Sequence, residues 1–360
     1  MVGVTASSID STIKPELPGM SRGMHFLPDH SLRIGHSPRR APNPDEIEIE
    51  VAFGGICGTD LHIFHGAMDW RLKSNPHIMG HEISGRVIRT GADVTHVRPN
   101  DPVSVMPLHP TGDDPIRRAG LEHICEGLKF LGIDMPGGFQ SHWTVPAHTA
   151  FKLPTGLSLR HAALIEPIAV ACHDIRIGGV KAGDHVVVVG GGPIGALIAC
   201  VARGAGARVL ISEINNHRIV LLRSMGFEVI DPRSTDPLEA IKQRTNGTRA
   251  DVVFEVSGHP DGIKSALHLV RARGVVVVVG IFITPPPVEL FQVFWRELQI
   301  RGARVYERED FRQAIDLAAA GRLPLDQLIT HELPLENLET GLRQMEAGNG
   351  TMKILLRITP

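Results

Sequence analysis

The sequence has few cysteines, and their scarcity excludes several classes of protein. Only Cys57, Cys125, Cys172 and Cys200 occur among 360 residues, and no two of them are closer than 28 residues. This spacing excludes a disulfide-dense secreted scaffold and a CxxC zinc knuckle. Any metal site must therefore combine one or two cysteines with carboxylates and with histidine, of which the chain has 19.

The sequence also lacks a strong net charge and a long apolar run. Its 37 basic and 39 acidic residues nearly cancel, which argues against nucleic-acid or membrane-surface binding through long-range charge. Apolar runs such as Val275–Val279 are far shorter than the ~20 residues of a membrane span. Residues 1–20 contain no signal-peptide pattern, so we expect a cytoplasmic protein with a loosely ordered N-terminal extension over residues 1–21.

A length of 360 residues suggests two domains, and the sequence pattern changes near Glu166. Before that point, short alternating segments such as Glu46–Ala52 predict strands of a mainly β domain. From Asp184 onward, strand and helix patterns alternate regularly. The fold class predicted for this part is therefore α/β with a doubly wound parallel sheet.

A glycine-rich turn follows the first predicted strand of the α/β part, His185–Val189. Gly190, Gly192 and Gly195 satisfy GxGxxG, with Pro193 and Ile194 opening the following helix. The first glycine permits a tight turn, the second allows close approach of a pyrophosphate, and the third allows close helix–strand packing. The segment therefore predicts a dinucleotide site, although a purely structural turn is the alternative.

An acidic residue stands where a ribose-binding carboxylate is expected. Glu213 follows the next strand, 23 residues after Gly190. A carboxylate there accepts hydrogen bonds from ribose hydroxyls and repels a 2′-phosphate, so the sequence favours NAD over NADP. Arg218 could stack on the adenine or weaken that preference. Ser257, which ends a later strand, is a further candidate for the nicotinamide ribose.

Potential zinc ligands cluster between residues 57 and 82. Cys57 and His81 would supply two of the three protein ligands of a catalytic zinc, and Glu82 or the distant Glu166 the third. Each residue alone has a structural explanation, because a lone cysteine is usually a small core residue. Spacing alone does not decide between the two interpretations.

The order of these motifs resembles one enzyme family. Cys57-Gly-Thr-Asp-Leu-His62, Gly80-His-Glu with Gly85 and Val87, Glu166-Pro and GxGxxG are together similar to the zinc-dependent medium-chain alcohol and polyol dehydrogenases. The resemblance extends from about residue 22 to the end and is strongest to the sorbitol, threonine and 2,3-butanediol dehydrogenase branch. It implies a GroES-like catalytic zinc domain of residues 22–171 and 309–360, and a Rossmann NAD-binding domain of residues 172–308.

The resemblance also implies roles for individual residues. Cys57 and His81 match zinc ligands, and either Glu82 or Glu166 matches the third. Asp60 matches a carboxylate that orients a ligand histidine. Thr59 and His62 match the residues that take the alcohol proton and pass it to solvent. Arg304 and Tyr306 fall where relatives place substrate-cleft residues.

The chain departs from many relatives in one respect. The stretch Val105–Gly138 holds only Cys125, where those relatives carry four cysteines that bind a structural zinc. We therefore expect one catalytic zinc per subunit and no structural zinc.

The prediction is an enzyme that oxidises a secondary alcohol, a vicinal diol or polyol, to a ketone with NAD and zinc. Alternatives are a threonine 3-dehydrogenase-like or simple secondary alcohol dehydrogenase, a zinc-free NADPH reductase, and a catalytically inactive nucleotide-binding protein. The resemblance implies a homodimer or homotetramer, and we expect no nucleic-acid or membrane partner.

Overall fold

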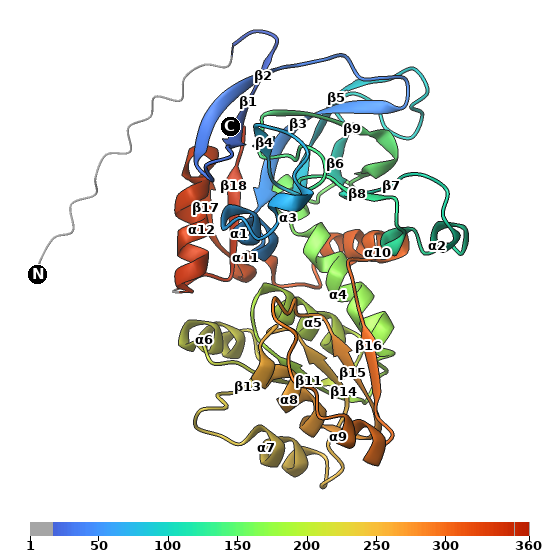
Figure 1. Ribbon diagram of the computed structural model, residues 1–360, viewed down its shortest axis with the longest axis vertical. Helices are drawn as coiled ribbons and strands as arrows, with labels where there is room; N and C mark the ends of the chain where they lie inside the picture. Colours follow the sequence, from blue (N-terminus) through green and yellow to red (C-terminus); the bar gives the residue numbers. More distant parts are fainter. Residues whose placement is uncertain (1–16, 349, 360) are drawn as a thin grey trace, which may run out of the picture.

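The computed structural model describes residues 17–348 and 350–359 (Figure 1). It contains a β-rich part at the top of the view and an α/β part below, so the predicted fold class is confirmed. Residues 1–16, most of the predicted N-terminal extension, lie outside the described residues. Met20 and Ser21, the last two residues of that predicted extension, already belong to the first strand. No helix among the described residues is long and apolar enough to cross a membrane.

The β-rich part is built on a seven-stranded sheet in which the alternating segment identified in the sequence is central. Ile47, Ile49 and Val51 are fully buried and Glu50 is exposed, as the period of two predicts. Glu48 is an exception, because it is buried in ion pairs with Arg39 and Arg89. The strand order is β10-β6-β5-β3-β18-β17, with β9 also pairing with β3. The bounds are β3 Glu46–Gly55, β5 Glu82–Thr90, β6 Pro102–Val105, β9 His142–Pro146, β10 Ala150–Lys152, β17 Ile329–Pro334 and β18 Lys353–Arg357.

Two smaller sheets and several short helices complete this part. One sheet has the order β2-β1-β4 and the other pairs β7 with β8. The strands are β1 Met20–Phe26, β2 Leu32–Pro38, β4 His77–Ile78, β7 Leu108–Pro110 and β8 Leu128–Phe130. The helices are α1 Gly58–Phe64, η1 Asp69–Arg71, α2 Pro115–Arg118, η2 Glu122–Ile124, η3 Ala147–Thr149, α3 Leu159–Ala162, α11 Leu325–Leu328, η4 Leu335–Asn337 and α12 Leu338–Ala347.

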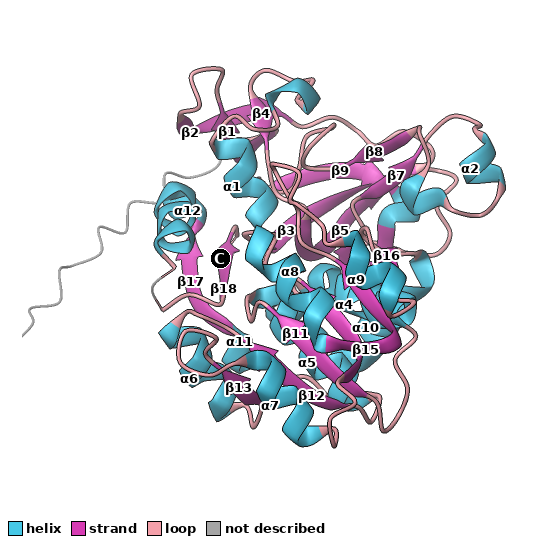
Figure 2. Cartoon of the chain, turned by 60° about the horizontal axis from the view of Figure 1, so that its bottom comes forward, coloured by secondary structure: helices cyan, strands magenta, loops and turns pink. Residues whose placement is uncertain are grey.

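The α/β part is a six-stranded parallel sheet of order β13-β12-β11-β14-β15-β16. Figure 2 shows its strands among the surrounding helices. Val186, Val187 and Val188 are fully buried, because helices cover both faces of the sheet. The strands are β11 His185–Val189, β12 Arg208–Ser212, β13 Glu228–Ile230, β14 Ala250–Glu255, β15 Val270–Val278 and β16 Gln299–Gly302; the helices are α5 Pro193–Gly204, α6 Asn216–Ser224, α7 Pro237–Arg244, α8 Pro260–Leu269 and α9 Leu290–Trp295.

Two longer helices, α4 Ile165–Gly178 and α10 Arg308–Ala319, lie at the junction between the two parts (Figure 1). They pack against each other, and α4 also packs against α5 of the α/β part. The predicted boundary between residues 171 and 172 falls inside α4, which is one continuous helix. The other predicted boundary, between 308 and 309, falls at the first turn of α10.

Candidate active site

Three of the predicted zinc ligands meet where β3 and β5 pair. Cys57 is the N-cap of α1, directly after β3, while His81 precedes β5 and Glu82 begins it. One ligand atom from each of the three lies within 4.8 Å of the others. Gly55 pairs with Glu82 in the antiparallel ladder, and a Cβ at Gly55 would lie 1.9 Å from Glu82 Oε2. Glycine at this position therefore leaves the space that the Glu82 carboxylate occupies.

Asp60 supports this cluster from α1. Its Oδ2 accepts a hydrogen bond from the Cys57 backbone N–H at 2.9 Å, and its Oδ1 lies 3.7 Å from His81 Nδ1. Burial opposes the protonated form of His81, but attraction to Asp60 and Cys57 outweighs it and raises the pKa of His81 to about 10. Asp60 thus lies where the predicted orienting carboxylate should be.

The chemistry of this donor set fits zinc. Cys57, His81 and Glu82 offer sulfur, nitrogen and oxygen, which are the three ligand types of catalytic zinc sites. Asp60 Oδ1 and His81 Nδ1 are buried and have no hydrogen-bond partner among the described residues. Buried polar groups without hydrogen-bond partners are rare. A cation bound to Nε2 of His81 would orient the imidazole so that its Nδ1 could donate a hydrogen bond to Asp60 Oδ1.

Glu166 reaches the same site from the first turn of α4. It is 5% exposed, and its Oε1 accepts a hydrogen bond from the Tyr306 hydroxyl at 2.8 Å. Burial raises the pKa of Glu166 to about 7, and the nearby Glu82 carboxylate adds to the shift. Glu166 is not part of the compact group of ligand atoms, which includes Glu82 instead. In this conformation the structure therefore favours Glu82 over Glu166 as the third ligand.

Lys353 is a buried cation of this site that the sequence analysis missed. Its Nζ forms an ion pair with Glu82 and donates a hydrogen bond to the Ile56 carbonyl at 3.0 Å. Attraction to Glu82 and Cys57 outweighs the effect of burial and raises the pKa of Lys353. The only sequence signal was a lysine at the start of the apolar strand β18, and such lysines are usually exposed.

The two predicted proton-relay residues lie on α1. Thr59 Oγ1 is 3.8 Å from Cys57 Sγ, and His62 follows about one turn later and is half-buried. The structure therefore brings Thr59 beside the ligand cluster, while their role in proton transfer stays a prediction.

The glycine turn joins β11 to α5 and has an open central position. Gly190 has φ +101°, and a Cβ at Gly195 would lie 1.9 Å from the Gly190 carbonyl oxygen. A Cβ at Gly192 would instead meet nothing closer than Arg218 Nη1 at 3.5 Å. Pro193 and the half-buried Ile194 open α5. A free helix N-terminus beside an open glycine fits a dinucleotide pyrophosphate.

Glu213, the predicted ribose-binding residue, lies beside the glycine turn. Its Oε2 accepts a hydrogen bond from Gly191 N–H at 2.7 Å, and its Oε1 accepts two more from the backbone that leads into α6. Arg218 Nη1 is 4.0 Å from Glu213 Oε2. Ser257, after β14, donates its hydroxyl hydrogen bond to Glu255, a buried residue that the sequence analysis did not single out.

The comparisons with known proteins match this architecture. Residues 43–155 match the model of the alcohol dehydrogenase GroES-like domain, and residues 193–320 match that of the zinc-binding dehydrogenases. A 2-dehydro-3-deoxy-L-galactonate 5-dehydrogenase of Pseudoalteromonas atlantica is 44% identical over 92% of this chain and 97% of its own. The chain belongs to the zinc-type medium-chain polyol dehydrogenase family.

Two further members illustrate the breadth of this family. An L-threonine 3-dehydrogenase of Bacillus velezensis is 34% identical over 87% of this chain and 92% of its own. A zinc-binding dehydrogenase structure from Sinorhizobium meliloti, bound to NADP, superposes with a TM-score of 0.87 at 30% identity, covering 94% of this chain and 99% of that one. The resemblance inferred from the sequence motifs is thus confirmed, and this chain is a zinc-type alcohol or polyol dehydrogenase.

The region predicted to lack a structural zinc contains β7, α2, η2 and β8. Its single cysteine, Cys125, is buried, and burial raises the pKa of its thiol. Within residues 17–348 and 350–359, only two groups of potential metal ligands are compact: the cluster that contains Cys57, and a second group that contains no cysteine.

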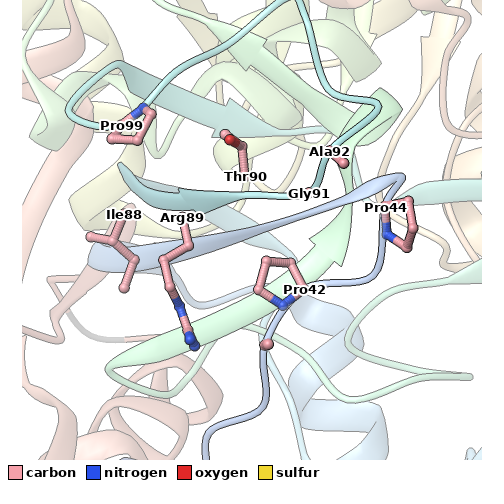
Figure 3. Close-up of a pocket in the computed structure, with 9 residues that line it drawn as sticks. Pro42, Pro44, Ile88, Arg89, Thr90, Gly91, Ala92 and Pro99 are labelled. Atoms are coloured by element: carbon pink, nitrogen blue, oxygen red, sulfur yellow. The ribbon is translucent and has the colours of Figure 1, made fainter.

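A shallow hollow of about 560 Å³ lies elsewhere, on the β-rich part (Figure 3). None of the candidate site residues lines it. Its lining residues are Ala41, Pro42, Pro44, Ile88, Arg89, Thr90, Gly91, Ala92 and Pro99.

Proposed function

We propose that this enzyme uses NAD and one catalytic zinc to oxidise a secondary alcohol of a polyol to a ketone. The observation that carries the proposal is the compact group of Cys57, His81 and Glu82 in the same chain as an open glycine turn. When bound, zinc lowers the pKa of an alcohol hydroxyl toward neutrality and NAD accepts the hydride.

The residues around this group have distinct tasks in the proposed reaction. Cys57, His81 and Glu82 hold the metal, and Asp60 keeps the His81 ring in place. Thr59 takes the alcohol proton and His62 passes it to solvent. Glu166, whose pKa is raised and which accepts a hydrogen bond from Tyr306, would be the alternative to Glu82 as the third ligand.

NAD is the proposed coenzyme because a carboxylate, Glu213, lies next to the glycine turn. A 2′-phosphate near it would be repelled, although Arg218 is close enough to reduce that repulsion. The NADP-bound relative shows that the family also accommodates the phosphorylated coenzyme. The ratio of kcat/KM for NAD to that for NADP tests this choice; a ratio below one contradicts it.

A polyol that carries a carboxylate is the substrate class we favour. The 44% identical relative is named for a galactonate, which is a sugar acid. Arg304 follows β16, two residues before Tyr306, and burial together with the neighbouring Arg71 lowers its pKa. Arg71 is paired with Asp134, whereas the one hydrogen bond that the Arg304 guanidinium donates within the described part of the chain goes to the His123 carbonyl. An anionic substrate group would neutralise Arg304. L-threonine and simple secondary alcohols are the alternative substrates.

The test is an initial-rate screen that follows NADH absorbance with sugar acids, neutral polyols, butanediols and L-threonine. We expect turnover of a polyol or sugar acid that is lost on zinc chelation and in Cys57→Ser, together with one tightly bound zinc ion. Cys172→Ser is the matched control, because Cys172 is a buried core residue outside the cluster. Activity that survives chelation and Cys57→Ser would favour the zinc-free reductase, and no oxidoreductase activity at all would favour the catalytically inactive protein. The cytoplasmic location stays a prediction.

The enzyme is further proposed to be a homodimer or homotetramer. β16 is an edge strand of the six-stranded sheet, and exposed apolar side chains gather in and before α9 beside it. Phe294 and Trp295 are 76% and 70% exposed. An apolar surface next to an open strand edge favours pairing with a second copy. Light scattering after size-exclusion chromatography should show an oligomer in the wild type and a monomer in Phe294→Asp/Trp295→Asp; a monomeric wild type would contradict the proposal. The exposed apolar residues of this surface are Ile281, Ile283, Val288, Leu290, Phe291, Phe294, Trp295 and Ile300.

A further inference from the structure

A second group of potential metal ligands lies outside the catalytic cluster. His123 of η2, His173 of α4 and Glu307, the N-cap of α10, each place one ligand atom within 4.8 Å of the other two. The two imidazoles are 7% and 2% exposed, and their ring centroids are 5.1 Å apart in an edge-to-face arrangement. Three elements that are distant in sequence thus bring two nitrogen donors and one carboxylate together.

His173 is oriented as a metal ligand would be. Its Nδ1 lies 2.9 Å from Oδ2 of Asp310, a residue that is 1% exposed. When Nδ1–H donates to this carboxylate, the lone pair of Nε2 is free to bind a metal ion. A carboxylate behind a histidine is the usual support of a metal-binding imidazole.

One ring nitrogen of His123 is available as a metal ligand. Its Nδ1 is buried and has no hydrogen-bond partner among the described residues. Burial and the neighbouring His173 lower the pKa of His123, so its imidazole is neutral near pH 7, the form that binds metals. An unpartnered buried nitrogen is costly, and a bound cation would satisfy it.

The charges around the group leave room for a cation despite a nearby arginine. Arg176 donates to Asp310 through Nε and Nη2, and to Glu307 Oε1 at 2.8 Å. Its alternative contact, with His173 Nδ1 at 3.0 Å, is therefore not needed to satisfy the guanidinium. Burial and the neighbouring Asp310 raise the pKa of Asp174 and so disfavour its charged form. Two carboxylates, Glu307 and Asp310, thus face the Arg176 guanidinium, and a second guanidinium, that of Arg304, contacts the backbone carbonyl of His123.

We propose that His123, His173 and Glu307 form a second metal site that binds a divalent transition-metal ion such as zinc. Two imidazoles and a carboxylate are ligands that zinc accepts, with water in the fourth position. Tetrahedral ligands at the usual zinc distances lie about 3.4 Å apart, so shifts of about 1 Å close the site. The site contains no cysteine and is additional to the single catalytic zinc.

The bound ion would act as a structural cross-link, so the expectation from the sequence that the chain holds no structural zinc would be wrong. His123 belongs to the segment where many relatives carry four cysteines, and the ion would tie this segment to α4 and α10. His173 lies seven residues after Glu166 on α4, about 10 Å along the helix axis on the same face. The second site is therefore separate from the catalytic cluster but on the same helix.

The test is metal uptake by the zinc-loaded enzyme. Equilibrium dialysis against micromolar free zinc, with metal analysis by mass spectrometry, should show one additional ion per subunit in the wild type. His123→Gln and Glu307→Gln should bind that ion at least tenfold more weakly. His109→Gln is the matched control, because it alters the other histidine pair, His109–His148, without touching this group. Circular dichroism establishes that each variant is folded.

Cobalt titration distinguishes the two sites. An ion bound with Cys57 gives sulfur-to-metal charge transfer, whereas the additional ion should add ligand-field bands without it. Cys57→Ser should lose the first ion and keep the second, so failure of the proposed function and failure of this site are separable. Uptake of no additional ion by the wild type, or equal uptake by folded His123→Gln, would refute the site and leave the group a hydrogen-bonded cluster.

Discussion

The ion pair between Lys353 and Glu82 allows a quantitative test of the electrostatics of the zinc site. Their side chains are only 5% and 1% exposed. Lys353→Met keeps most of the aliphatic chain of Lys353 but removes the charge. Removal of one partner of a buried ion pair typically costs about 3–5 kcal/mol, because the other charge stays buried without compensation.

Proton uptake by the remaining carboxylate limits this cost. Protonating a glutamate side chain with an ordinary pKa of about 4.3 costs about 3.7 kcal/mol at pH 7. This cost falls by about 1.4 kcal/mol for each unit by which the pH is lowered below 7. We expect metal-free Lys353→Met to be less stable than the metal-free wild type by about 3–4 kcal/mol at pH 7 and by about 2 kcal/mol at pH 6. The folded variant then binds one proton more than its unfolded chain, so its stability falls as the pH rises.

Zinc should remove most of this difference, because a divalent cation held by Glu82 supplies the charge that Lys353 otherwise provides. The assay is urea unfolding at pH 6 and pH 7, with and without bound zinc, for the wild type and Lys353→Met. Lys181→Met, at an exposed position, is the matched control. An equal loss of stability with and without zinc, or a loss independent of pH, would refute the view that Lys353 neutralises Glu82.

Three further predictions concern the glycine turn, Glu166 and Arg304. Gly192→Ala should raise the KM for NAD without lowering stability. Gly195→Ala should also destabilise the fold, because its Cβ would lie 1.9 Å from the Gly190 carbonyl oxygen. Equal thermal stability of the two variants would contradict this prediction. Because burial raises the pKa of Glu166 to about 7, the stability of the metal-free enzyme should fall as the pH rises from about 5 to 7, by up to about 1.4 kcal/mol per pH unit. Urea unfolding at each pH measures this dependence, and Glu166→Gln should remove it. Arg304→Ala should raise the KM for a sugar acid at least tenfold, more than for a neutral polyol and unlike the exposed control Arg322→Ala; equal effects on both substrates would argue against a carboxylate partner.

Much of the fold could be predicted from the sequence, because local patterns determine it. Glu46–Ala52 alternates with period two and forms β3, and His185–Val189 is a continuous apolar run that forms the central strand β11. The glycine turn and Glu213 could be predicted for the same reason, since they follow adjacent strands of one βαβ unit. The sequence did not predict that α4 is one continuous helix across the predicted domain boundary, because its composition changes little there.

The two groups of potential metal ligands illustrate which contacts local sequence patterns do not predict. Cys57, His81 and Glu82 were identified by their motifs, but Lys353 reaches Glu82 across 271 residues and carries no motif. His123, His173 and Glu307 are each unremarkable in sequence, and only the packing of η2, α4 and α10 brings them together. Long-range contacts of this kind need the three-dimensional arrangement.

The segment that follows β16 shows how one short stretch connects the two parts of the enzyme. Val305, a β-branched residue, has φ +49°, a conformation that such residues rarely adopt. On its C-terminal side, Tyr306 donates to Glu166 at the start of α4, and Glu307 accepts from Arg176 near the end of the same helix. The segment leaves the nucleotide-binding sheet and holds α4 at two points about 15 Å apart along its axis. The position of Glu166 beside the proposed zinc ligands is therefore fixed from the side of the α/β part, which explains why strain is tolerated at Val305.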